Sequence, residues 1–115
     1  MQTTGSGIQY QVTKQGDGGA KPPKGTKVKA HYTGWLKGFN DGPAFDSSRT
    51  KGRFFEFQAG VGQVIPGWDE MICDMTKGEA RNIILPPNMA YGSRGAGGVI
   101  PPNATLYFEM ELVDF

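Results

Sequence analysis

The sequence predicts an α+β fold in which about five antiparallel strands curl around one short helix. Several segments alternate apolar and polar residues, a pattern typical of an antiparallel sheet with one face toward the core and one toward water. A single segment has helical spacing, and since one helix cannot cover both faces of a flat sheet, the sheet must curl around it. The chain has 115 residues, which is enough for one domain with its own apolar core.

The N-terminal part predicts two strands joined by a long loop. Residues 1–7 lack the charged and apolar regions of a signal peptide, and we expect a flexible lead-in before a single domain of residues 8–115. Residues 8–13 alternate and predict the first strand, whereas the Gly- and Pro-rich residues 16–25 predict a loop. The alternation is clearest in residues 26–36, whose expected inward side chains are Val28, Ala30 and Tyr32.

The helix is predicted over residues 65–75. Pro66 suits the first helical position, where its missing N–H costs no hydrogen bond. Asp69 and Glu70 follow in the first turn, where the helix dipole favours acidic side chains, and Gly78 suits the stop after the helix. The apolar residues at helical spacing on one face are Ile65, Trp68, Ile72 and Met75.

The remaining strands are separated by turn-rich segments. Residues 54–58 predict a short strand, and residues 81–85 predict a strand that is ended by Pro86-Pro87. Residues 105–113 alternate apolar and acidic side chains and predict the last strand. The connecting segments are a turn at 38–43, an extended stretch at 45–48 and a Gly-rich loop at 88–98.

The composition excludes several classes of function. The formal net charge is +1, so no basic excess points to nucleic acid, and no apolar run is long enough to span a membrane. The only cysteine, Cys73, cannot form an internal disulfide, which favours a reducing compartment; we expect a cytoplasmic protein with a buried, inert thiol in mid-helix. Because His31 is the only histidine, an ordinary zinc site is excluded, and we expect neither metal nor cofactor.

Aromatic residues gather near the ends of the expected elements. Each one alone is explained as part of the core of a small β-rich domain. Residues at element ends line rims, so together they could form an apolar cleft, the usual form of a ligand site. Trp68, in the first turn of the helix, is therefore either a core residue or the floor of a cavity, and spacing alone leaves both open. The residues concerned are Tyr32, Phe45, Phe55, Phe57, Trp68, Tyr91 and Phe108.

The carboxylates also have competing interpretations. Asp46 follows Phe45 and is either a half-buried acid facing the cleft or a turn residue bonded to nearby backbone N–H groups. Asp69 and Glu70 could suggest the acid pair of a glycosidase. As first-turn charges of the helix they have a simpler explanation.

Six short motifs, in order and at nearly constant spacing, resemble one family over roughly residues 8–115. Any one of them is weak, but the ordered set is specific. The chain resembles the FKBP-type peptidyl-prolyl cis–trans isomerases, the immunophilins that bind tacrolimus and rapamycin. The motifs are His31-Tyr32-Thr33-Gly34, Phe45-Asp46-Ser47-Ser48-Arg49, Phe55-Glu56-Phe57, Val64-Ile65-Pro66-Gly67-Trp68, Ala90-Tyr91-Gly92, and Ile100 to Leu106 ending in Phe108.

This resemblance implies an enzyme that isomerises X–Pro bonds in protein folding and binds tacrolimus and rapamycin. The alternative is a proline-recognition module with little turnover. Implied partners are X–Pro peptides and proteins and, through the drug complex, calcineurin or the rapamycin target kinase. We expect a monomer.

The resemblance also implies where the site lies. Trp68 is the implied floor, the Ile65 N–H and the Tyr91 hydroxyl are the implied donors to ligand carbonyls, and Phe57 lies deeper. The implied catalytic residues are Tyr32, Asp46, Trp68, Tyr91 and Phe108. The implied substrate and inhibitor contacts are Tyr32, Phe45, Asp46, Phe55, Val64, Ile65, Trp68, Tyr91, Ile100 and Phe108.

Three features depart from the family pattern. The connection at 38–43 is longer than in the shortest members. Lys51 stands where the best-known members carry an arginine that pairs with the pocket aspartate, and a lysine can pair with Asp46 only without the bidentate fork. Glycines in residues 95–98 replace bulkier residues, which predicts a mobile loop with altered contacts.

Overall fold

Strands β3 (Lys27–Trp35) and β7 (Leu106–Asp114) form the centre of the sheet in the computed structural model, which describes residues 1–115. They pair antiparallel along most of their length, from Ala30 opposite Leu112 to Trp35 opposite Tyr107. Because side chains alternate across a strand, each presents one apolar and one polar face. The predicted inward residues are all buried: Val28, Ala30, Tyr32, Leu106, Phe108, Met110 and Leu112.

The sheet has seven strands, in the order β1-β2-β6-β7-β3-β4, with β5 also paired to β3. The predicted number was about five, and the five longer strands are the predicted ones. The two-residue strand β4 lies in the predicted extended stretch, whereas β1 lies in residues 1–7, where no strand was predicted. The other strands are β1 (Gln2–Thr3), β2 (Gln9–Lys14), β4 (Asp46–Ser47), β5 (Phe55–Gln58) and β6 (Ala80–Leu85).

Helix α1 (Pro66–Ile72) begins with Pro66 in its first turn, as predicted. It ends earlier than predicted, and Cys73 is its half-buried C-cap rather than a mid-helix residue. Beyond Ile72 the chain tightens, because the Met75 N–H bonds to the Ile72 carbonyl three residues back. Met75 remains fully buried after this turn, which is why its spacing resembled a continued helix.

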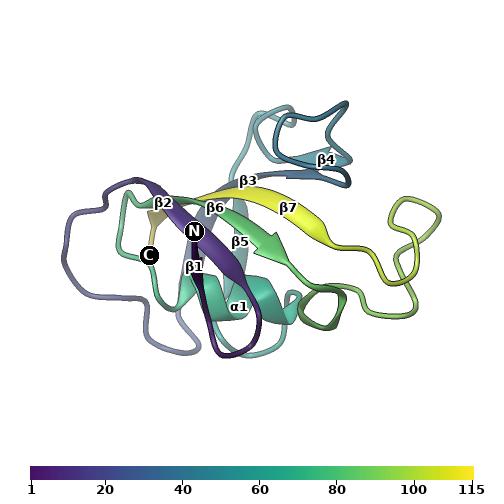
Figure 1. The fold of residues 1–115 in the computed structure, drawn as a ribbon. Coiled ribbons are helices and arrows are strands. Elements are labelled where there is room, and N and C mark those ends of the chain that lie inside the picture. Colours follow the sequence, from purple (N-terminus) through teal and green to yellow (C-terminus); the bar gives the residue numbers. More distant parts are fainter.

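The helix lies against one face of the sheet, which folds over it (Figure 1). Close approach at the start of the helix depends on Gly67. A Cβ there would overlap the Leu85 side chain at the end of β6 and lie 2.9 Å from the Met89 carbonyl oxygen. Met89 belongs to the short 3₁₀ turn η1 (Pro87–Met89), which begins at the second of the two prolines that end β6. Gly67 therefore lets the helix and the chain after β6 pack directly together.

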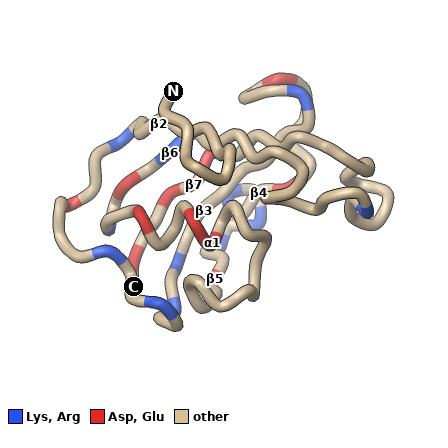
Figure 2. The backbone as a smooth tube through the Cα atoms, turned by 60° about the horizontal axis from the view of Figure 1, so that its bottom comes forward, with Lys and Arg blue, Asp and Glu red and all other residues tan.

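Charged side chains of both signs are spread along the chain (Figure 2). Unlike most of the charged side chains, Arg81 is buried, with only 5% of its surface exposed. Its guanidinium bonds the Glu79 carboxylate, lies 3.0 Å from the Asp74 carboxylate and stacks 4.6 Å from the centre of the Tyr10 ring. This network joins the turn after α1 to strands β2 and β6. No helix in the structure has the length and apolar character needed to cross a membrane.

Replacing Gly67 by Ala should destabilise the fold. Overlap with Leu85 and the Met89 backbone should cost about 3 kcal/mol, against a helix-propensity gain of about 1 kcal/mol. Urea unfolding should show a net loss of about 2 kcal/mol. Gly5→Ala is the control, because nothing lies within 4 Å of its Cβ position. Equal stabilities of the two variants would contradict this account of helix packing.

Candidate active site

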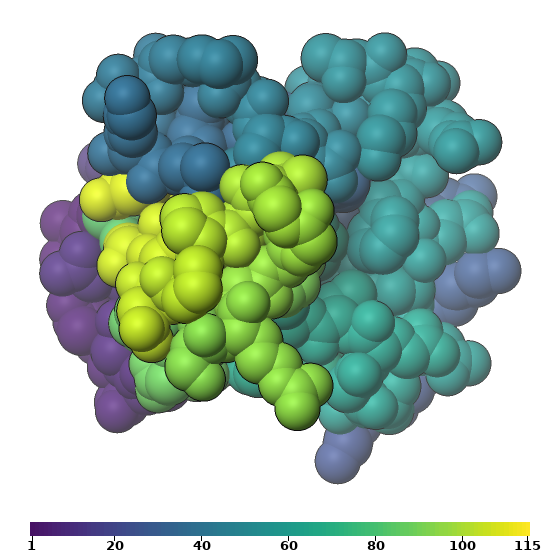
Figure 3. All heavy atoms as spheres, turned by 90° about the vertical axis from the view of Figure 1, so that its right-hand side faces the viewer, coloured from purple at the N-terminus to yellow at the C-terminus, as the bar shows by residue number.

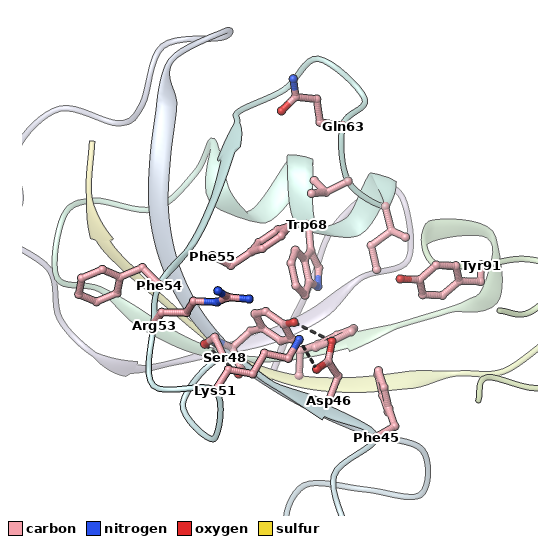
Figure 4. Close-up of a pocket in the computed structure, with 14 residues that line it drawn as sticks. Phe45, Asp46, Ser48, Lys51, Arg53, Phe54, Phe55, Gln63, Trp68 and Tyr91 are labelled. Carbon is pink, nitrogen blue, oxygen red and sulfur yellow. Dashed lines mark hydrogen bonds and ion pairs between the residues drawn. The ribbon is translucent and has the colours of Figure 1, made fainter. Parts of the chain in front are cut away.

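A cavity of about 440 Å³ opens between the start of the helix and the folded sheet. Its walls come from segments far apart in the sequence. Figure 3 shows the surface hollowed between the blue, teal and green segments of the chain, and Figure 4 shows the converging side chains. The 14 lining residues are Tyr32, Phe45, Asp46, Ser48, Lys51, Arg53, Phe54, Phe55, Gln63, Val64, Ile65, Trp68, Tyr91 and Phe108.

Trp68 forms the floor of this cavity and is 7% exposed. Its indole is fixed by surrounding rings, with centroid distances of 4.7 Å to Tyr32, 5.1 Å to Phe108 and 5.8 Å to Phe55. Tilted and edge-to-face packing of this kind is favourable for aromatic quadrupoles. The indole Nε1 is buried and has no hydrogen-bond partner. Trp68 is thus both a core residue and the flat base of an apolar cavity.

Asp46 supplies the polar wall. Its carboxylate accepts hydrogen bonds from the Tyr32 hydroxyl at 2.7 Å and from its neighbour Ser47 N–H at 2.9 Å, and Lys51 Nζ lies 2.9 Å away. Asp46 therefore combines features of both interpretations: it is a half-buried acid facing the cavity, and it accepts a bond from a nearby backbone N–H, although it lies in β4 and not in a turn. Lys51 does pair with Asp46, through a single nitrogen.

The protonation states of Asp46 and Tyr32 follow from these contacts. Burial raises the pKa of Asp46, but hydrogen bonds from Tyr32 and Lys51 and the charge of Lys51 outweigh it, so the pKa lies below its usual value. Asp46 is therefore ionised at neutral pH. Its contribution to stability is present above the unfolded-state pKa and is lost as the pH falls through the lowered pKa. Burial, followed by the bond to Asp46 and its charge, raises the pKa of Tyr32, which stays neutral.

Two donors at the cavity have no partner inside the protein. Ile65 lines the cavity, and its backbone N–H makes no intramolecular hydrogen bond. Tyr91 is 41% exposed and its hydroxyl is unbonded; Figure 4 shows that hydroxyl directed toward Trp68. Burial, with the charge of Asp46 as a smaller cause, raises the pKa of Tyr91 and keeps the hydroxyl protonated. Both groups can donate to carbonyls of a bound chain.

All the site residues named from the resemblance line the cavity except Ile100. Ile100 is 5% exposed and packs in the core, where its backbone bonds to Ala96 in both directions and closes the loop. It shapes the loop that carries Tyr91 instead of contacting the cavity. Phe57 lies behind the lining, with its ring 5.6 Å from Phe55 and 6.2 Å from Trp68.

Five lining residues were not named as site residues from the sequence, and one of these, Lys51, was expected only as the partner of Asp46. Ser48 is one of them, although it lies in a quoted motif; its hydroxyl accepts the Tyr32 N–H at 2.8 Å and contacts His31 Nδ1 at 2.9 Å. The others reach the cavity only because loops fold back, and no local pattern marks that. They are Arg53, Phe54 and Gln63.

The cavity combines an apolar floor with unbonded hydrogen-bond donors, an arrangement suited to a protein that holds a bound chain in place. The sequence matches the family described as FKBP-type peptidyl-prolyl cis-trans isomerase over residues 18–113. The chain belongs to this family, and rotation about X–Pro bonds is its activity.

The sequences of individual relatives match most of this chain. FK506-binding protein 1 of Dictyostelium discoideum is 49% identical over 95% of this chain and 98% of its own length. Peptidyl-prolyl cis-trans isomerase Fkbp12 of Drosophila melanogaster is 48% identical over 93% of this chain and 96% of its own length. An FK506-binding protein of Neisseria meningitidis serogroup C is 50% identical over 83% of this chain and 84% of its own length.

Replacing Lys51 by Gln should raise the pKa of Asp46, because the ammonium no longer favours the ionised carboxylate. Carboxyl carbon shifts followed by NMR over a pH titration measure this directly. Lys77→Gln is the control, since Lys77 pairs with Asp114 at 3.0 Å, away from the cavity. An unmoved Asp46 titration in the Lys51 variant would contradict the assigned pair.

Proposed function

We propose that the cavity above Trp68 is where this enzyme rotates X–Pro bonds. The observation that carries the proposal is the buried indole, ringed by aromatic side chains and open to solvent on one side. A proline ring is compact and apolar, and it can lie against this base. Its burial against Trp68 would exclude water from the adjoining peptide bond.

The physics of the X–Pro bond explains why such a cavity suffices. Rotation is slow because amide resonance is lost when the bond is twisted. The twisted bond is less conjugated and has a smaller charge separation than the planar amide, so a water-poor cavity suits it better than water does. Catalysis is then preferential binding of the twisted form. An acceleration of ~10⁶-fold needs only about 8 kcal/mol.

The polar groups of the cavity hold the chain while the bond turns. The free Ile65 N–H and the Tyr91 hydroxyl can each donate to a substrate carbonyl, which fixes the chain on one side of the bond. Asp46 keeps Tyr32 in place through the 2.7 Å hydrogen bond. No proton has to move between protein and substrate, and the raised pKa values of both tyrosines suit this role.

The same cavity is proposed to bind the macrocycles tacrolimus and rapamycin. Support comes from the relatives, several of which are named FK506-binding proteins and match nearly the whole chain. A drug complex would present a surface to calcineurin or to the rapamycin target kinase. We also propose a monomer in the cytoplasm, in keeping with a single cysteine that cannot form an internal disulfide.

Trp68→Leu should lower kcat/KM for a Leu-Pro peptide about tenfold or more, because a flat aromatic base is lost. Exchange NMR on the cis and trans peptide signals measures the rate. Trp35→Leu is the control: Trp35 is equally buried but packs against Phe39, 6.3 Å away, outside the cavity. Both variants are compared well below their melting temperatures. Equal losses of kcat/KM in the two variants would contradict the role of Trp68.

Tacrolimus should quench or shift the emission of Trp68 and saturate at one drug per chain. Trp35→Phe leaves Trp68 as the only tryptophan, so the signal reports on the cavity floor. Isothermal calorimetry on the same variant gives an independent stoichiometry. Heat of binding without any change in emission would place the drug elsewhere, and the absence of both would contradict drug binding.

A further inference from the structure

A second, more open hollow of about 330 Å³ adjoins the cavity, and the two share lining residues from the segment around the start of β5. This hollow is lined by His31, Arg49, Gly52, Arg53 and Phe54. Arg53 and Phe54 line both spaces, so they form the boundary between them. A side chain of a peptide bound over Trp68 would therefore lie near residues that line the second hollow as well.

The charges at this boundary do not cancel. Three charged side chains line the main cavity, and two of them, Asp46 and Lys51, pair with each other. Arg53 has no carboxylate within 4.0 Å, and its guanidinium makes no hydrogen bond inside the protein. Arg49, on the other side of the hollow, is already held by Glu111 at 2.7 Å. Arg53 thus leaves one uncompensated positive charge beside the substrate site.

The backbone that carries this cation is folded back by hydrogen bonds. The Gly52 N–H bonds to the Arg49 carbonyl at 3.2 Å, and the Arg53 N–H bonds to the Ser48 carbonyl at 3.4 Å. Gly52 has a φ of +70°, which suits glycine in this turn. Figure 4 shows the guanidinium reaching from this loop over the cavity, between Phe55 and Lys51.

We propose that Arg53 forms a subsite for an acidic side chain next to the substrate proline. The inference rests on the proposed isomerase site and specifies which peptides it prefers. A guanidinium presents paired N–H donors that match the two oxygens of an Asp or Glu carboxylate. Because Arg53 is exposed, salt screens the interaction, and a preference of about two- to five-fold is expected.

The test compares peptides that differ only in charge. Ac-Ala-Glu-Pro-Ala-NH₂ and its Gln counterpart place the carboxylate before proline, and a second Glu/Gln pair places it after. Exchange NMR gives kcat/KM for each peptide with the wild-type protein, Arg53→Gln and Lys37→Gln. Lys37 is the matched control, because it is an exposed cation without an ion pair and lines neither hollow.

The expected result is a Glu-to-Gln ratio of kcat/KM that falls about two- to five-fold in Arg53→Gln for at least one peptide pair. High salt should reduce the wild-type ratio toward that of the variant, whereas Lys37→Gln leaves the ratio unchanged. An active enzyme whose ratios do not respond to Arg53→Gln overturns the subsite alone. Inactivity toward every peptide overturns the proposed function instead. In that case the subsite is tested by the Glu-to-Gln ratio of peptide dissociation constants, measured from NMR shifts for the wild-type protein and for Arg53→Gln.

Discussion

The packing of the Trp68 indole against rings from three strands is the constraint on which the rest of the structure depends. Tyr32 comes from β3, Phe55 from β5 and Phe108 from β7, so the sheet must curl around the helix for all three to reach the indole. Gly67 permits the close approach that sets the helix at this depth. The core and the cavity are therefore one aromatic cluster, buried on one side and open on the other.

The polar groups of the site are arranged around this cluster with few uncompensated charges. An ionised Asp46 beside an apolar floor would be costly alone, and it is held by Tyr32, Lys51 and the Ser47 N–H. The unbonded donors, by contrast, are the Ile65 N–H and the Tyr91 hydroxyl, which we propose as the donors to substrate carbonyls. In the mechanism that we propose, these polar groups position the substrate chain and do not attack it. Arg53, the exception to the charge balance, lies at the edge, where a substrate side chain could meet it.

The sequence predicted the parts of the fold that depend on local periodicity. Alternation identified β3 and β7 with their buried faces, and Pro66 marked the start of the helix. The apolar spacing predicted the end of the helix too late, because the tightened turn after the helix still buries Met75. Spacing could not decide the role of Trp68 or bring Arg53 to the cavity, since both depend on how distant segments fold together. The resemblance named nine of the 14 lining residues, and it also placed Ile100 in the cavity, whereas the structure has Ile100 in the core.

The most direct test of the account is where a substrate proline rests. Transferred nuclear Overhauser effects, measured on a Leu-Pro peptide in exchange with the protein, report which protein protons lie near the proline ring. We predict cross-peaks from the proline ring protons to the Trp68 indole, accompanied by a shift of the free Ile65 amide. Cross-peaks only to residues outside the cavity, with the Trp68 and Ile65 signals unchanged, would contradict it.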